Sequence, residues 1–507
     1  MKTVMKGVAL RFGAVAAVAG VLVGVASVVP PRVPEAGRPP SRVALERATL
    51  VCPEPSFVRG VSSTDVAAIS ALTEADIPGR RSGRRLEPAL DIAPLGQTKA
   101  VASGTRRHEV VSYSVRTSEV PPLLVAARGD LAPGVTAGQL TRTDEGPLRG
   151  LAEALCVAPA SEFWFVGAGS EVGRHGRVYL TNADEGTAHV DLLLFDEKGP
   201  VAAETGRGLA IKGGSQMVVE LDRLAPTSKR LAVAVRTRQG RVTAALRDDA
   251  VQGETPQGVD WIPAAVPPAR DVVVPGIAPG SGERVLSIVA PGDSTATVEV
   301  SILSPQGSFR PAGLERVEVK PGAVTQIRLD EVTQKSAAAV RLTSDVPVTA
   351  SVRSVVGATD GPRDVVHTAA TRAVAGTAVV PLTLGGARRS ATLLLSTTSQ
   401  RSASATITLH ALDGRPLDKT ETTVRPGSTA AVKLTAPARE KHYVITVRSD
   451  SGGPLYGARL LVENAPDGPL ASAWPLFSGA TTAVRPVARP DPTAGIGSEE
   501  PRDAIFG

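Results

Sequence analysis

The chain has 507 residues, of which 42% are hydrophobic, enough apolar material for several folded domains. Its formal net charge of +6 is small for this length, and its basic residues are interleaved with acidic ones, so a nucleic-acid partner is disfavoured. Only 3% of the residues are aromatic, which predicts cores packed from alanine, valine and leucine.

The N-terminus has the composition of an export signal. Lys2, Lys6 and Arg11 precede an uncharged apolar run, and this order of segments engages the secretion machinery. Small residues ending at Ala26 permit cleavage, but the run of about 19 residues is also long enough to remain as a membrane anchor. Residues 1–30 are therefore predicted to be a signal peptide or a transmembrane helix, with the rest of the chain outside the membrane.

Two segments follow before the repeats begin. Residues 31–47 are rich in proline, which suits neither a helix interior nor a strand ladder, so they are predicted to be an extended spacer. Residues 48–160 contain short strand-like runs and are predicted to form a degenerate β-rich domain. Within this domain, residues 65–73 are expected to form one or two helical turns.

The chain has two cysteines, Cys52 and Cys156, one near each end of this domain. In an exported protein a lone pair most economically forms a disulfide. Two free buried thiols or a redox site are the alternatives, although the sequence has no CxxC spacing.

The rest of the chain is dominated by a repeat with three copies. The copies begin at Arg177, Arg284 and Ser390, and each contains a glycine turn, a second turn of the type apolar-basic-x-Gly-small, and several short strands. The glycines of the first turn, Gly199, Gly307 and Gly414, recur at a period of about 107 residues. The second turn is found at residues 211–215, 319–323 and 424–428. This period is the size of a small sandwich domain.

Each copy is predicted to be all-β. Alternating apolar and polar residues place Val298, Val300 and Ile302 on one buried face, and such half-buried strands need a second sheet to cover them. We therefore expect tandem immunoglobulin-like β-sandwiches, and the alternative is a β-propeller with two small blades per copy. The three sandwich repeats are predicted at residues 161–265, 266–372 and 373–478. Residues 479–507 are predicted to be a disordered tail.

Five aromatic residues near the repeat boundaries are candidate interface residues. Phe163, Trp164 and Phe165 form the densest aromatic cluster, while Trp261 and Trp474 follow the first and third copies. They are expected to fill the core and the junctions between domains. The alternative is an exposed binding platform, which would require these side chains to be accessible.

The sequence contains no recognisable catalytic or metal motif. It lacks HExxH and GxSxG, its six histidines are scattered, and a glycine-rich stretch at residues 167–173 joins two expected strands instead of opening a helix. We therefore predict no catalytic residues, no cofactor and no metal.

Three stretches resemble a known family: LVCPEP around Cys52, the segment from Cys156 to Gly167, and the repeats of the type that begins at Arg177. They are similar to an uncharacterised family of actinobacterial secreted or membrane-anchored proteins, a domain of unknown function whose genes often lie beside envelope glycosyltransferases. The resemblance implies an envelope location and a role with cell-surface polysaccharide. It supplies no catalytic residues.

The favoured hypothesis is a non-enzymatic envelope protein that acts as a scaffold or as a binding module for an envelope protein or glycan, and that meets the membrane through its N-terminal segment at least transiently. The alternative is a carbohydrate-active or accessory enzyme of envelope polysaccharide assembly, which a deep pocket at a domain junction would favour. A third hypothesis, a β-propeller ligand sensor, requires a central channel.

Overall fold

The computed structural model describes residues 41–55, 62–72, 77, 86–115, 120–357 and 361–485. The chain divides into a large compact unit, residues 44–482, and a second unit made of residues 1–43 and 483–507. The predicted signal or anchor at residues 1–30 lies outside the described residues.

Two strands near the chain ends form a sheet of their own. Strand β1 (Ser41–Ala44) pairs with β34 (Thr482–Arg485). The spacer was predicted to be extended without a strand ladder and the tail to be disordered. At these residues the structure differs, because each strand supplies the hydrogen-bond partners of the other. The tail from residue 486 onward lies outside the described residues.

The large unit is all-β and consists of four modules. Modules 1, 2 and 4 each have two four-stranded sheets of the same strand order, and in module 3 the two sheets are joined into one of eight strands. Module 1 has the sheets β2-β7-β4-β5 and β6-β3-β8-β9 and a short 3-10 helix, η2. Their bounds are β2 Arg47–Cys52, β3 Ser62–Ser70, β4 Ala89–Pro94, β5 Ala102–Gly104, β6 Val111–Val115, β7 Leu123–Arg128, η2 Gly129–Leu131, β8 Val135–Thr143 and β9 Gly150–Cys156.

Module 2 has the sheets β10-β15-β12-β13 and β14-β11-β16-β17, with two short helical turns, η3 and α2. Their bounds are β10 Glu162–Ala168, β11 Arg174–Asn182, β12 Ala188–Phe195, η3 Glu204–Gly206, β13 Leu209–Ile211, β14 Ser215–Glu220, α2 Leu221–Leu224, β15 Leu231–Gln239, β16 Thr243–Gln252 and β17 Thr255–Ile262.

In module 3 one long strand, β24, serves both sheets: its first part pairs with β18 and β20, and its second part pairs with β19 and β25. The bounds are β18 Ala269–Ile277, β19 Arg284–Val289, β20 Ala296–Ser304, β21 Gly307–Phe309, β22 Val317–Val319, β23 Val324–Arg328, β24 Ala338–Val356 and β25 Asp364–Ala369.

Module 4 has the sheets β26-β31-β28-β29 and β30-β27-β32-β33. Their bounds are β26 Thr377–Leu384, β27 Arg389–Thr397, β28 Ala403–His410, β29 Pro416–Val424, β30 Thr429–Leu434, β31 His442–Gly452, β32 Leu455–Ala465 and β33 Gly468–Pro475.

The predicted sandwich fold is confirmed. In module 2, Phe165 from one sheet and Leu246 from the other belong to one buried apolar cluster, so the sheets face each other across a shared core. The propeller alternative, with separate blades, does not describe this packing. Val298, Val300 and Ile302 are fully buried, as their alternation predicted. The expected helical turns at residues 65–73 are wrong, because this segment lies mostly in β3, whose backbone pairs with β6 and β8.

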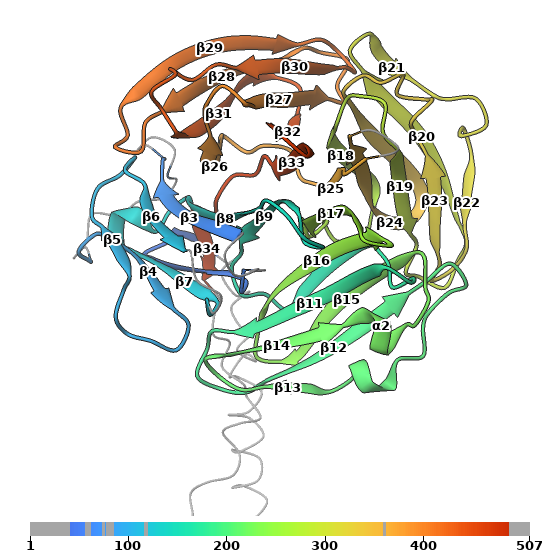
Figure 1. Cartoon of the computed structure of the whole chain (residues 1–507), viewed down its shortest axis with the longest axis horizontal. Helices are drawn as coiled ribbons and strands as arrows, with labels where there is room; N and C mark the ends of the chain where they lie inside the picture. Colours follow the sequence, from blue (N-terminus) through green and yellow to red (C-terminus); the bar gives the residue numbers. More distant parts are fainter. Residues whose placement is uncertain are drawn as a thin grey trace, which may run out of the picture. The chain divides into compact units, whose positions relative to one another are not determined.

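The last strand of each module packs against the last strand of the next. Contacts join β9 to β17, β17 to β25, β25 to β33 and β33 back to β9. Figure 1 shows these inner strands at the centre, with module 1 in blue, module 2 in green, module 3 in yellow and module 4 in orange around them. We call this arrangement the ring, and the line between the inner strands its axis.

At the periphery, the two turns that mark the sequence repeat meet between neighbouring modules. A Cβ atom on Gly322 of module 3 would lie 2.7 Å from the Pro200 ring of module 2, and one on Gly427 of module 4 would lie 3.2 Å from Ser308 of module 3. The same contact closes the ring, since a Cβ on Gly414 of module 4 would lie 2.8 Å from a backbone oxygen of module 1.

Candidate functional site

The inner strands each lie at the edge of a sheet, so one side of each backbone has no strand partner. Buried backbone N–H groups must nevertheless be hydrogen-bonded. At the axis these groups are satisfied by carboxylates instead of by a further strand.

Asp364, at the start of β25, accepts hydrogen bonds from the backbone of every module. The donors are the N–H groups of Leu151 (2.9 Å), Val259 (3.3 Å), Val365 (2.9 Å) and Ala471 (2.9 Å). Because its side chain is fully buried, Asp364 joins the four inner strands without contact to water.

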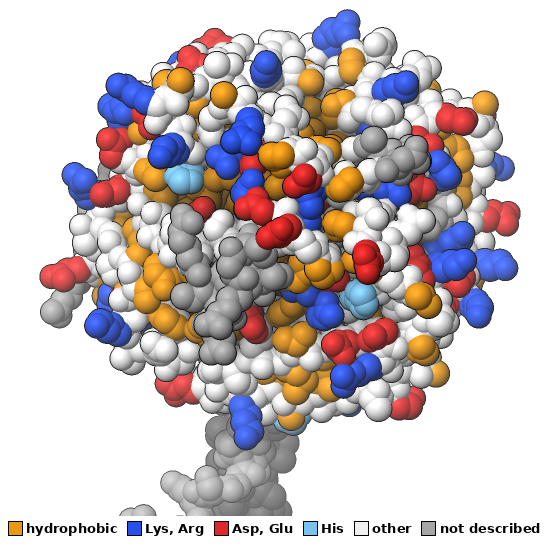
Figure 2. All heavy atoms as spheres, viewed as in Figure 1, with side chains coloured by type: hydrophobic (Ala, Val, Ile, Leu, Met, Phe, Trp, Pro, Cys, Tyr) orange, Lys and Arg blue, Asp and Glu red, His pale blue; other side chains and the backbone are white. Residues whose placement is uncertain are grey.

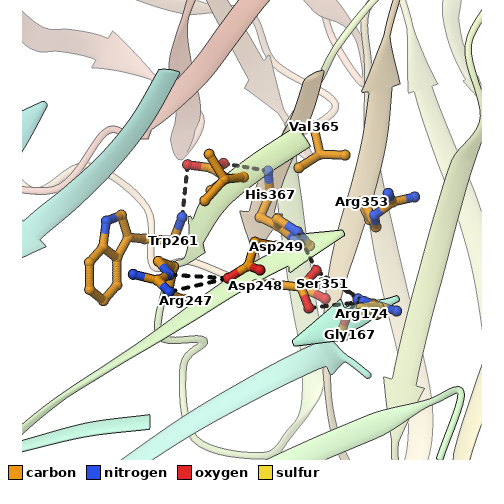
Figure 3. A network of polar contacts seen from close by, with 12 residues as sticks. Gly167, Arg174, Arg247, Asp248, Asp249, Trp261, Ser351, Arg353, Val365 and His367 are labelled. Carbon is orange, nitrogen blue, oxygen red and sulfur yellow. Dashed lines mark hydrogen bonds and ion pairs between the residues drawn. The ribbon is translucent and has the colours of Figure 1, made fainter. Parts of the chain in front are cut away.

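Asp260 of β17 forms a second arrangement of this kind, two residues further along the inner strands. It accepts the N–H groups of Glu153 at 3.3 Å, Trp261 at 2.9 Å and His367 at 3.0 Å, the last two of which are drawn in Figure 3. Each of these donors lies two residues after a donor to Asp364. The strands β9, β17 and β25 therefore run in the same direction along the axis.

Both axial carboxyl groups are shifted by their surroundings. Burial raises the pKa of Asp364 to about 7, although its four N–H partners oppose this effect. Burial also raises the pKa of Asp260 well above its usual range, and the nearby charge of Asp364 adds to the shift.

A charged network lies beside the axis between modules 2 and 3. Arg174 donates to both oxygens of Asp248 at 2.9 Å, and the Nε2 atom of His367 lies 3.4 Å from Asp248 Oδ2 (Figure 3). Burial alone would raise the pKa of Asp248, but Arg174 and His367 lower it below its usual value. Burial lowers the pKa of the fully enclosed His367. Burial and the like charge of Arg174 lower the pKa of Arg353 to about 10.

A pocket of about 390 Å³ lies where the inner strands end. Its walls come from all four modules, and they consist of residues within 153–157, 261–266, 370–375 and 475–478, together with Phe165, Ala244 and Ala245. Ligand pockets in proteins commonly have volumes in this range and apolar walls with a few polar groups.

The polar groups of this pocket are few. Glu153 is bound by Arg459 and by the Ser472 hydroxyl, and burial raises its pKa although Arg459 opposes the shift. Among the described residues, the indole N–H of Trp261 and the hydroxyl of Thr371 have no hydrogen-bond partner. Both of these atoms are enclosed and have no surface open to the pocket. The charged side chains of the lining are therefore Glu153, which is occupied, and Arg372, which is exposed.

The five candidate aromatic residues are all buried, so they form no exposed platform. Phe163 and Phe165 belong to the core of module 2. The three tryptophans lie at junctions: Trp164 packs with module 3, Trp261 with module 1, and Trp474 with module 1.

A glycine explains how Trp474 fits against module 1. A Cβ atom on Gly138 would lie 2.2 Å from the Trp474 ring, so only glycine leaves room for the indole at this position.

The predicted disulfide between Cys52 and Cys156 is confirmed. It joins the first strand of module 1 to the last one, β9, and so ties one of the inner strands to the opposite sheet. No cysteine is left free.

The axial residues were missed at the level of sequence. A signal for part of them was present, because Glu153, Asp260 and His367 place an ionisable side chain in the last strand of successive modules at intervals of 107 residues. In the described part of the chain, no group of three or more His, Cys, Asp or Glu side chains is placed to hold a metal ion. No helix within the same residues is long and apolar enough to cross a membrane.

Comparison with protein families adds one finding. The model of a family of unknown function (DUF5719) matches residues 111–435, well over half of the 507 residues. The chain belongs to this family. The DUF5719 match runs from β6 of module 1 to just after β30 of module 4, so it includes β9, β17 and β25 and both axial carboxylates.

Outside DUF5719 the comparisons are weak. None of the curated proteins matches the chain. A Thermotoga maritima protein, 1070, is 20% identical, with 20% of this chain and 94% of that chain covered and a TM-score of 0.18. A tetra-tandem repeat from the extending region of a large adhesion protein is 10% identical, with 87% and 100% covered and a TM-score of 0.10. With TM-scores this low, neither similarity bears on fold or function.

Proposed function

We propose that this protein is an exported, non-enzymatic binding or scaffold module of the cell envelope, and that it binds its ligand in the pocket at the end of the axis. The observation that carries the proposal is the origin of this pocket, whose walls come from all four modules. A site at the meeting point of several domains is where proteins commonly bind ligands.

Two features support export. The N-terminal sequence has a basic segment followed by an apolar one, and the disulfide between Cys52 and Cys156 is of a kind that persists in oxidising compartments. The resemblance noted for the sequence adds an actinobacterial origin and an association with envelope polysaccharide. The N-terminal segment would bring the chain to the membrane, either as an anchor or before cleavage.

The charge distribution supports a partner other than nucleic acid. On the face drawn in Figure 2, basic and acidic side chains are interspersed instead of being gathered by sign. Nucleic-acid binding surfaces concentrate lysine and arginine on one face.

Export is tested by fractionation. The native protein would be isolated from membrane and culture fractions, and its intact mass determined with and without reduction and alkylation. We expect alkylation only after reduction, and either a membrane-bound species that retains residues 1–26 or a released one that begins near Ser27. A protein found in the cytoplasm with reactive thiols would contradict export.

The binding site is tested with a blocked pocket. Ala264 is exposed and lines the pocket, so Ala264→Trp should fill the opening without disturbing a core. Ala210→Trp, at an exposed position on β13, is the matched control. Immobilised wild-type and variant proteins would be incubated with detergent-extracted envelope material, and bound molecules identified by mass spectrometry. Molecules retained by the wild type and the control, but not by Ala264→Trp, support the proposal, whereas equal retention by all three refutes it.

The second candidate is a carbohydrate-active enzyme, and the observation that favours it is this same pocket at a junction of domains. Against it stands Glu153, whose two oxygens are bound by Arg459 and Ser472, since a general acid or base needs access to its substrate. Turnover of envelope glycans that is lost in Glu153→Gln would establish the enzyme instead.

A further inference from the structure

We infer that the pocket at the end of the axis takes an amphiphile, a molecule with an apolar chain and an anionic head group, and that Arg372 binds the head group. This inference rests on the proposed function and specifies the ligand class for the same site. Two properties of the pocket lead to it: its apolar wall and the charge of the exposed Arg372.

The apolar wall indicates that the main part of the ligand is an apolar chain. Apart from Glu153, which is occupied by Arg459 and Ser472, the residues contributed by the strand ends are mainly alanine, proline, valine and phenylalanine. A volume of about 390 Å³ holds on the order of ten methylene groups, if each takes about the share of one water molecule. Sugars, by contrast, are bound through many polar groups, which this wall lacks.

Arg372 indicates the charge of the head group. It lines the pocket next to Thr371 and is exposed, and its side chain forms no ion pair or hydrogen bond with the described residues. With Glu153 neutralised by Arg459, Arg372 is the uncompensated charge of the lining. A guanidinium binds carboxylate and phosphate oxygens through paired hydrogen bonds.

The inference is tested with three soluble probes that share a chain and differ in the head group. Dodecanoate, dodecanol and dodecyltrimethylammonium would be titrated into the full-length protein below their micelle-forming concentrations, with binding followed by calorimetry. We expect dodecanoate to bind about tenfold more tightly than the cationic probe, which corresponds to a charge-assisted contact of modest strength.

Variants of Arg372 distinguish the contribution of the head group to binding from that of the apolar chain. Arg372→Glu should reverse the preference between anion and cation, while Arg401→Glu, an equal change of charge at an exposed loop of module 4, should not. Vesicles that contain dodecanoate, compared with the free probe, distinguish a ligand taken from a membrane from one taken from solution.

The failures of the two proposals are distinguishable. Equal binding of the three probes, all abolished by Ala264→Trp, would overturn the anionic head group and leave the pocket as a binding site. If no probe binds, the ligand class is wrong, and retention of envelope material by wild type but not by Ala264→Trp still supports the proposed function. If Ala264→Trp changes neither the binding of the probes nor the retention of envelope material, both proposals are wrong.

Discussion

Single carboxylates perform at the axis the task that a neighbouring strand performs elsewhere in a sheet. Asp364 offers two oxygens to four backbone N–H groups, one from each inner strand. Two strands can pair only if their edges lie side by side at a fixed spacing. One carboxylate requires only that four backbone N–H groups point toward it. The arrangement therefore depends on one residue to an unusual degree.

The first prediction concerns this residue. Asp364→Asn would place an amide nitrogen, which cannot accept a hydrogen bond, where an oxygen now accepts two N–H groups. We expect a loss of about 2–5 kcal/mol in the free energy of unfolding, because buried donors are left without partners. Chemical denaturation measures this loss.

The matched control is Asp271→Asn on β18, whose carboxylate is 51% exposed and pairs with Arg341 at 2.7 Å. A surface ion pair of this kind contributes at most about 1 kcal/mol. Equal losses in the two variants would contradict the role of Asp364.

The second prediction concerns pH and His367. Burial lowers its pKa below the usual value of about 6.5, so the unfolded chain takes up a proton at a pH where the folded chain does not. The stability that depends on a neutral His367 is complete above pH 6.5 and is lost as the pH falls from there toward the lowered pKa.

Denaturation at pH 7.5, 6.5 and 5.5 measures this loss. Below pH 6.5 the wild type should lose up to about 1.4 kcal/mol per pH unit more than His367→Gln, which cannot take up a proton. The same pH dependence in both proteins would show that His367 does not titrate in this way.

At the scale of elements, the two repeated turns do more than connect strands. Their positions in the repeat, at Gly199 and its equivalents and at the second, basic turn, are the positions at which modules touch. The turn of module 3 lies on that of module 2, as shown also by the hydrogen bond from the N–H of Val324 to the carbonyl of Asp196 at 2.8 Å. The two turns recur in each repeat because each pair of neighbouring modules meets through the same contact.

The third prediction compares two glycines of module 3. Gly322 has a φ of +63° and faces Pro200, whereas Gly313 has a φ of +82° and faces open space. Alanine at either position strains the backbone by about 1–2 kcal/mol, but Gly322→Ala also forces a contact with the neighbouring module, which should add about 1–3 kcal/mol.

The measurement is the difference in free energy of unfolding between the two variants. Because the backbone strain is common to both, the difference isolates the contact between modules. Equal losses would mean that the turns do not support each other.

Sequence reasoning identified these elements but not their assembly. The alternation around Val300 gave a correct buried face, and the lone pair Cys52 and Cys156 gave a correct disulfide. The role of Asp364 was not accessible in this way, because its four partners are as many as 213 positions distant and contribute only backbone atoms. The same limit applies to the pocket, whose walls are alanines and prolines that carry no motif.

At the scale of the whole molecule, the modules share their cores. One buried apolar cluster contains residues of modules 2 and 3, and another contains residues of modules 1 and 4. A module in this ring cannot unfold alone without exposing part of its neighbours' apolar surface. The ring should therefore unfold as one cooperative unit.

The fourth prediction tests this cooperativity through the disulfide. Its cysteines are 104 residues apart, so in the chain-entropy model the bridge contributes about 4–5 kcal/mol. Calorimetry of the Cys52→Ala, Cys156→Ala double variant should show the single transition of the wild type moved as a whole to lower temperature. A new early transition for module 1, with the remainder unchanged, would show that the modules unfold independently.

The contact between Gly414 and module 1 also limits how many modules the ring can hold. In an open array of repeats, the loss or duplication of one unit during replication leaves every remaining neighbour in place, and such arrays vary freely in length. Here the removal of one unit would leave two turns facing each other across a gap, and an added unit would separate the inner strands from Asp364. Closure of the ring therefore fixes the number of modules at four in this chain.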